Sequence, residues 1–166
     1  IINAGHKPYL VDIDKNSLCP SLRELTNLAL EKKVNAIIYT HLHGYNINLK
    51  NLAQICSKNN ILLIEDCAQS LWCKDYFEAI DLPGSYGDAA LFSTGFFKNI
   101  NTFSGGFLLL KNKDLRFKKV IIQHQLLPIN IQKDFVYRAI YGLMFKLLTN
   151  NLIFSNILFP ILKVGF

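Results

Sequence analysis

The sequence predicts an α/β fold, a three-layer arrangement with a mostly parallel sheet, followed by an apolar helical tail. Short β-branched apolar runs alternate with helical patterns from Tyr9 to Lys111, which favours right-handed crossovers and a parallel sheet covered on both faces. From Val136 onward, apolar residues occupy every face of a helical pattern. We therefore expect one large-domain segment over residues 1–111 and a helical, apolar segment over residues 112–166.

The first half of the chain supplies three strands and two helices. Ser21 can cap a helix that runs to about Lys33, with Glu24 at its third position, and Asn48 can cap a second helix. The apolar runs that predict strands are Tyr9–Ile13, Val34–Tyr39 and Ile61–Ile64.

Two further strands follow glycine-rich turns. Asp88–Phe92 comes after Gly84 and Gly87, and Gly106–Lys111 comes after Gly105. The middle of the chain is therefore a layered α/β unit.

The tail carries few charges. Lys146, the Asn150-Asn151 pair, Asn156 and Pro160 interrupt the apolar residues too often for a clear membrane span, which needs about 20 mostly apolar residues. We expect a buried or subunit-interface helix first, with membrane-surface contact and a true span as alternatives.

The net charge of +6 suggests an acidic partner, but the lysines are scattered and no aromatic residues interleave with a basic stripe. We expect no nucleic-acid binding. The four cysteines (Cys19, Cys56, Cys67 and Cys73) show no CxxC pairing, which favours reduced thiols in a cytoplasmic protein. The tail leaves membrane association of such a protein open.

Polar residues follow three of the predicted strands. They are Thr40 to Gly44, the Glu65-Asp66 pair and Ser93. Because ligands bind beyond the carboxyl ends of parallel strands, we expect these residues to converge on one rim.

Three residues near this rim supply complementary chemistry. Asp66 closes an apolar strand and needs a positive partner, while Lys98 follows Phe96-Phe97 in a setting that favours the nucleophilic amine. Ser93 and the backbone N–H groups of its turn suit a phosphate. A carbonyl-trapping lysine, a carboxylate for a ring nitrogen and a phosphate contact are what pyridoxal 5'-phosphate (PLP) requires.

The order and spacing of several motifs resemble the DegT/DnrJ/EryC1/StrS family of PLP-dependent sugar aminotransferases. The motifs are Thr40-His41-Leu42-His43-Gly44, Ile64-Glu65-Asp66-Cys67-Ala68-Gln69-Ser70, Gly87-Asp88-Ala89-Ala90-Leu91-Phe92-Ser93, Lys98-Asn99-Ile100 and Gly105-Gly106. The resemblance implies that the segment is an internal piece of the large domain of a fold-type-I PLP enzyme.

The resemblance also implies roles for individual residues. Lys98 would be the Schiff-base lysine, Asp66 the partner of the pyridine nitrogen, Gln69 a contact to the ring face or its 3'-oxygen, and Ser93 a phosphate ligand. His41 would sit beside the cofactor. Lysine at position 98 favours transamination, because family members with another residue there perform dehydration.

For the whole protein, the resemblance implies transfer of an amino group, commonly from glutamate, to a keto-sugar linked to a nucleotide. Polysaccharide or lipopolysaccharide biosynthesis is the expected pathway, and a homodimer is the expected state of the full-length protein.

Two other interpretations remain open. A zinc-dependent hydrolase could use His41 and His43 with Asp66, but this leaves Ser93 and Lys98 without a role. A truncated, non-catalytic relative could instead use the apolar tail to contact a membrane or a partner.

Overall fold

The structure is a computed structural model that describes residues 1–45, 47–71, 82–95, 98–102, 104–111, 115–126 and 132–164. Cys73 and the Phe96-Phe97 pair lie outside these residues. Four strands form one sheet in the order β1-β2-β3-β4, with bounds Ala36–Thr40, Leu62–Asp66, Ala89–Ser93 and Gly106–Leu110. β1, β2 and β3 are parallel and β4 is antiparallel, which confirms the predicted α/β class and mostly parallel sheet.

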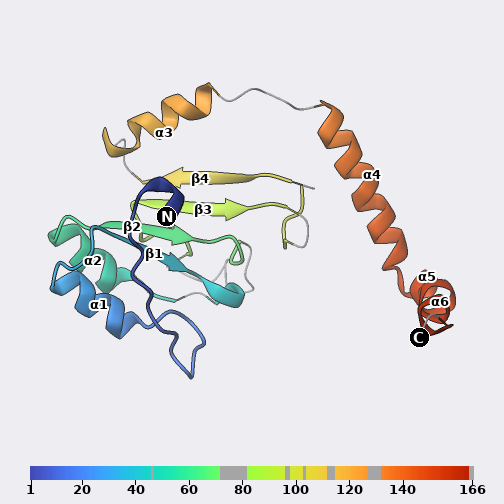
Figure 1. Ribbon diagram of the computed structural model, residues 1–166, viewed down its shortest axis with the longest axis horizontal. Helices are drawn as coiled ribbons and strands as arrows, with labels where there is room; N and C mark the ends of the chain where they lie inside the picture. The colour runs from blue at the N-terminus through green and yellow to red at the C-terminus, as the bar shows by residue number, and fades with distance from the viewer. Residues whose placement is uncertain are drawn as a thin grey trace.

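Two helices pack beside the first two strands (Figure 1). They are α1 (Leu22–Leu30) and α2 (Lys50–Lys58). The Ser21 hydroxyl accepts a hydrogen bond from the Glu24 backbone N–H at 3.4 Å, which confirms the predicted cap of α1. At α2, Asn48 Oδ1 accepts from the Lys50 backbone N–H at 2.9 Å.

One face of the sheet forms the core with these helices. Ile37, Tyr39 and Leu63 point to this face because side chains alternate along a strand, and all three are buried. The main cluster also contains Leu25, Ala29, Leu49, Leu52, Cys56, Ile61 and Tyr86. On the opposite face, Ile38, Leu91 and Leu108 are exposed, whereas Ala89 is buried.

The predicted strand at Tyr9–Ile13 is wrong. This segment forms an isolated antiparallel bridge between Ile13 and Pro20 and no continuous ladder. An apolar run becomes a strand only if a second strand pairs with it over several residues. Among the described residues, this run pairs at one position alone, Ile13 with Pro20.

The remaining helices lie in the C-terminal part of the chain. α3 (Leu115–Gln125) lies beyond β4, and the later helices are drawn apart from the sheet (Figure 1). They are α4 (Gln132–Leu148), α5 (Asn151–Ile153), the π-helical turn η4 (Phe154–Leu158) and α6 (Phe159–Val164). Two short 3₁₀ turns, η1 (Ile2–Ala4) and η2 (Leu42–Gly44), lie earlier in the chain. The division of the chain at residue 111 into two segments stays a prediction.

Among the described residues, no single helix is long and apolar enough to cross a membrane. One helix pair, Val136–Leu148 with Asn151–Lys163, reaches the required length and composition only when the two are taken together, and it bends by 59°.

Candidate active site

The carboxyl ends of the parallel strands meet at one edge of the sheet. Thr40 of β1 pairs with Asp66 of β2, and Asp66 pairs with Leu91 of β3. The hairpin from β3 to β4 turns at the same edge, since Ser93 pairs with Gly106. The polar residues that follow these strands are therefore neighbours, as the strand order predicts.

Alternation along the strands separates two acidic neighbours. Leu91 and Ser93 lie two residues apart on β3 and share a face, and the register places Asp66 on that same face. Glu65 points to the other face, into the core, where it is fully buried. Asp66 and Ser93 therefore lie on one side of the sheet, and Glu65 lies on the other.

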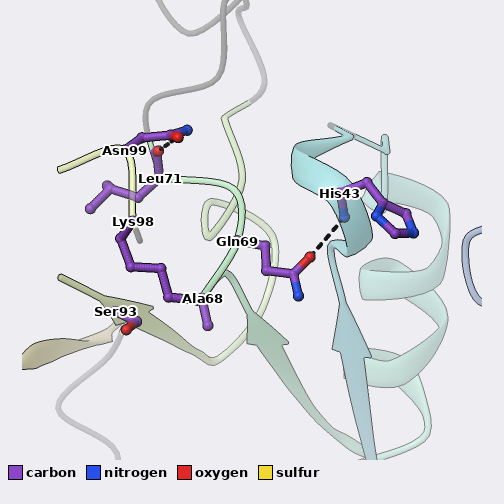
Figure 2. Close-up of a pocket in the computed structure, with 7 residues that line it drawn as sticks. All are labelled: His43, Ala68, Gln69, Leu71, Ser93, Lys98 and Asn99. Atoms are coloured by element: carbon purple, nitrogen blue, oxygen red, sulfur yellow. Dashed lines mark hydrogen bonds between the residues drawn. The ribbon is translucent and has the colours of Figure 1, made fainter. Parts of the chain in front are cut away.

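A cavity of about 310 Å³ lies at this edge and is shown in Figure 2. Its volume is at the lower end of the roughly 300–1,000 Å³ that is usual for ligand pockets. Lys98 extends across it toward Ala68 and Ser93 (Figure 2). The residues that line it are His43, Ala68, Gln69, Leu71, Ser93, Lys98 and Asn99.

The Lys98 side chain is half-buried, and its ammonium has no hydrogen-bond or ion-pair partner among the described residues. A lysine usually keeps its charged end in water or next to a carboxylate. A half-buried lysine that faces a cavity without such a partner is placed to meet a ligand that enters the cavity.

The hairpin that carries Lys98 is held at its base. The Thr102 hydroxyl donates to Thr94 Oγ1 at 2.8 Å, and the Thr102 backbone N–H donates to the Thr94 carbonyl at 2.8 Å. The Thr94 backbone N–H donates to the Gly105 carbonyl at 3.0 Å. Gly105 has a φ of 109°, a backbone conformation that residues other than glycine rarely adopt.

Gln69 links the turn after β2 to the turn after β1. Its Oε1 accepts a hydrogen bond from the His43 backbone N–H at 3.0 Å. The His43 imidazole points away from the cavity (Figure 2), and His43 has a φ of 57° in this turn. Gln69 therefore lines the cavity, and its oxygen is engaged with the neighbouring loop; its contact with the cofactor stays a prediction.

Asp66 is half-buried at the end of β2 and does not line the cavity. Its Oδ1 accepts a hydrogen bond from the Ala68 backbone N–H at 3.1 Å. Its Oδ2 has no hydrogen-bond partner in the part of the chain that the structure describes. One carboxylate oxygen thus orients the side chain, and the other can accept a hydrogen bond from a ligand.

His41 and Glu65 form a buried pair that the sequence analysis did not assign. His41 Nε2 lies 2.9 Å from Glu65 Oε2, and both side chains are completely buried. Glu65 also accepts backbone hydrogen bonds from Gly84 at 2.8 Å, Tyr86 at 2.7 Å and Gly87 at 2.5 Å. Glu65 therefore fastens the turn before β3 to the ends of β1 and β2.

The hydrogen bonds decide the charge state of Glu65. Burial by itself raises the pKa of the Glu65 carboxyl, but the hydrogen bonds from His41 and from three backbone N–H groups together outweigh it, and the pKa lies below its usual 4.5. Glu65 is therefore an anion at neutral pH. The signal in the sequence was a glutamate at an inward-facing position of an apolar strand.

The structure offers little to the zinc interpretation. Among the described residues, the metal-binding side chains that lie within 4.8 Å of one another are His41, Glu65 and Cys67, without His43. Glu65 already accepts four hydrogen bonds, and burial raises the pKa of the Cys67 thiol to about 12. This group has the properties of a polar core cluster.

The structure thus brings together three of the five residues predicted to form the site. Lys98, Ser93 and Gln69 line one cavity, Asp66 lies nearby on the Ser93 face, and His41 is buried against Glu65 away from the cavity. The lining residues that the sequence analysis did not assign are Ala68, Leu71 and Asn99. Their proximity depends on the turn after β2, where Asn99 Nδ2 donates to the Leu71 carbonyl at 3.2 Å.

The side chains of the cavity and the neighbouring Asp66 suit PLP. Of the lining residues, the Lys98 amine fits the aldehyde and the Ser93 hydroxyl fits the phosphate. Asp66 is outside the lining, and its Oδ2 fits the ring nitrogen.

Comparisons with known proteins identify the fold and the family of the chain. The GDP-perosamine synthase of Vibrio cholerae is 28% identical over 122 residues, which are 73% of this chain and 32% of the relative. The PLP form of a protein described as a sugar aminotransferase from Streptococcus pneumoniae has a TM-score of 0.60 at 24% identity, over 76% of this chain and 35% of that chain.

An E. coli GDP-4-keto-6-deoxy-D-mannose-3-dehydratase with bound hydrated PLP has a TM-score of 0.57 at 24% identity, over 71% of this chain and 30% of that chain. The chain therefore spans about a third of the length of these relatives. The model of the DegT/DnrJ/EryC1/StrS aminotransferase family matches residues 1–150, and the chain belongs to that family.

Proposed function

We propose that the full-length protein is a PLP-dependent aminotransferase that transfers an amino group, with glutamate as donor, to a keto-sugar linked to a nucleotide. The observation that carries the proposal is the half-buried Lys98, which faces Ser93 across one cavity at the carboxyl edge of the sheet. This is the edge at which parallel sheets bind ligands.

Each residue has a distinct task in this proposal. Lys98 Nζ would hold the cofactor covalently and, once released, move a proton at the substrate carbon. Asp66 Oδ2 would keep the ring nitrogen protonated, and Ser93 Oγ would bind the phosphate. When bound, PLP supplies an electron sink for the pair of electrons that a departing proton leaves behind. The buried Glu65 pair would keep the strand ends in register.

The substrate class rests on the relatives. GDP-perosamine synthase and the GDP-keto-sugar dehydratase both have nucleotide-linked sugars in their names. Lysine at position 98 favours transamination over dehydration for this chain. We further propose a role in polysaccharide or lipopolysaccharide biosynthesis, a homodimeric full-length protein and a cytoplasmic location.

Covalent capture of the cofactor tests the proposal. The full-length protein is incubated with PLP and reduced with borohydride, and the modified peptide is identified by mass spectrometry. Modification of Lys98 and a visible absorption band are expected, and Lys98→Ala should lose both. Lys50→Ala is the control, because Lys50 is an exposed lysine on α2.

Asp66→Asn refines the same experiment. This variant should still bind PLP but lose most of its transamination rate, because a neutral partner cannot keep the ring proton. Labelling of a different lysine would refute the site. Complete lack of labelling in the full-length protein would favour the non-catalytic interpretation.

A further inference from the structure

The helical tail exposes its apolar side chains. Exposed fractions on α4, α5, η4 and α6 range from 38% at Phe145 to 73% at Leu152 among the large apolar residues that are exposed. A water-soluble helix normally buries one apolar stripe and exposes a polar face. These helices instead need an apolar environment that other described parts of the chain do not supply.

Two basic residues of α4, Arg138 and Lys146, lie on the same side of the helix. They are eight residues apart with Gly142 midway between them, and residues spaced by four follow one another along a helix, so these three positions form a row, called here the Arg138–Lys146 row. Tyr137 and Tyr141 stack beside this row, with ring centroids 6.5 Å apart. Tyrosine is enriched where a membrane surface meets water, since its ring is apolar and its hydroxyl is polar.

Beyond the first turn of α4 the charge of the tail has one sign. After Asp134, which lies in that first turn, the sequence contains no aspartate or glutamate, and its charged residues are Arg138, Lys146 and Lys163. Such a segment is complementary to a surface that carries negative charge, and long basic side chains can reach that surface while their stems stay in apolar surroundings.

Three uncharged polar side chains of the tail donate to backbone carbonyls one turn earlier. Thr149 Oγ1 donates to the Phe145 carbonyl at 2.9 Å, and Asn156 Nδ2 donates to the Leu152 carbonyl at 2.8 Å. The Ser155 hydroxyl also donates to a backbone carbonyl one turn earlier. In an apolar medium an unsatisfied polar group costs several kcal/mol, so internal pairing of this kind suits a helix that leaves water.

The geometry favours lying on a membrane over crossing it. The Val136–Leu148 segment is roughly 20 Å long at about 1.5 Å per residue, whereas the hydrocarbon core is about 30 Å thick. The 59° bend follows Lys146 closely, so insertion of the pair as a broken span would carry that charge toward the bilayer centre.

We propose that α4, α5, η4 and α6 bind the surface of a bilayer that contains anionic lipids, with the Arg138–Lys146 row facing the headgroups. The apolar sides of the helices enter the boundary between headgroups and acyl chains. The tail thereby holds the enzyme at a lipid surface. This inference does not depend on the proposed aminotransferase activity.

Vesicle flotation of the full-length protein tests the proposal. Binding to phosphatidylcholine vesicles that contain phosphatidylglycerol is expected, with much weaker binding to pure phosphatidylcholine and with loss at high salt. Combining Arg138→Gln with Lys146→Gln should weaken binding by roughly 25-fold, since each basic residue near an anionic surface contributes about five-fold. Lys50→Gln combined with Lys58→Gln, on α2, is the matched control.

The depth to which the tail enters the bilayer is measured separately, in a protein that keeps Arg138 and Lys146. Leu143→Trp places a reporter on the apolar side of α4, and its fluorescence should shift to the blue and be quenched by brominated lipids. No quenching, or equal binding of the two double variants, would overturn the proposal. The proposal would also be overturned if the protein did not bind vesicles and its tail instead formed a dimer that the Leu143→Asp substitution abolished.

Discussion

The sheet and the tail use apolar residues in opposite ways. Leu63 on β2 is 1% exposed, whereas Leu152 on α5 is 73% exposed. The sheet also buries a charged group, Glu65, while the charged residues of the tail after Asp134 are cations spread along its helices. A strand must find other strands before its backbone is satisfied, but a helix satisfies its backbone alone. Helical form in the tail therefore carries no information about burial.

The largest expected effect comes from removing the negative charge of Glu65, which is buried on the core face of the sheet. Glu65→Gln should lower the free energy of unfolding by about 3–5 kcal/mol, because one acceptor oxygen becomes a donor facing groups that also donate. Urea denaturation of the full-length protein measures this. Glu31→Gln is the control, since Glu31 pairs with Lys33 on the surface and its loss should cost no more than about 1 kcal/mol. If the free energy of unfolding fell equally in the two variants, the buried hydrogen bonds of Glu65 would stabilise the fold no more than a surface ion pair does.

A matched pair of leucine substitutions tests the contrast in burial directly. Leu63→Ala should cost about 2–5 kcal/mol because it leaves a cavity in the core. Leu152→Ala should change the free energy of unfolding in water by no more than about 0.5 kcal/mol. A large loss from Leu152→Ala would mean that the tail packs into a core after all.

Acid should weaken the sheet through Glu65. The pKa of Glu65 is lower in the folded protein than its usual 4.5, so the stabilisation is fully present above that value and is lost as pH falls through the folded pKa. Denaturation midpoints measured from about pH 7 to pH 3 should therefore fall less steeply in Glu65→Gln than in the parent. An unchanged slope would assign the acid sensitivity to other carboxylates.

The smallest effect concerns a helix end beside the sheet. Ser21→Ala should cost about 1 kcal/mol, because the N-cap of α1 loses its acceptor for the Glu24 N–H. Thermal denaturation measures the loss, and Ser21→Asp should recover it. If Ser21→Ala had no effect, the 3.4 Å cap bond would be too long to matter.

Local patterns were reliable where an element depends on its own residues. The Ser21 cap, the two helices and the strands at Ile61 and Asp88 could be predicted, since periodicity and capping are local properties. The Tyr9–Ile13 strand could not be judged, because pairing depends on a distant partner. His41 shows the same limit: its place next to Glu65 follows from the β1–β2 register.

The sequence by itself determined the alternation of strands and helices, the residue types of the candidate site and the family of the chain. The fold decided which of those residues share a cavity, which of two adjacent acids, Glu65 or Asp66, enters the core, and which helices remain exposed. The physical reason is the distance along the chain over which each interaction acts. Backbone preference acts over a few residues, whereas burial and the meeting of side chains depend on segments that are far apart in the chain.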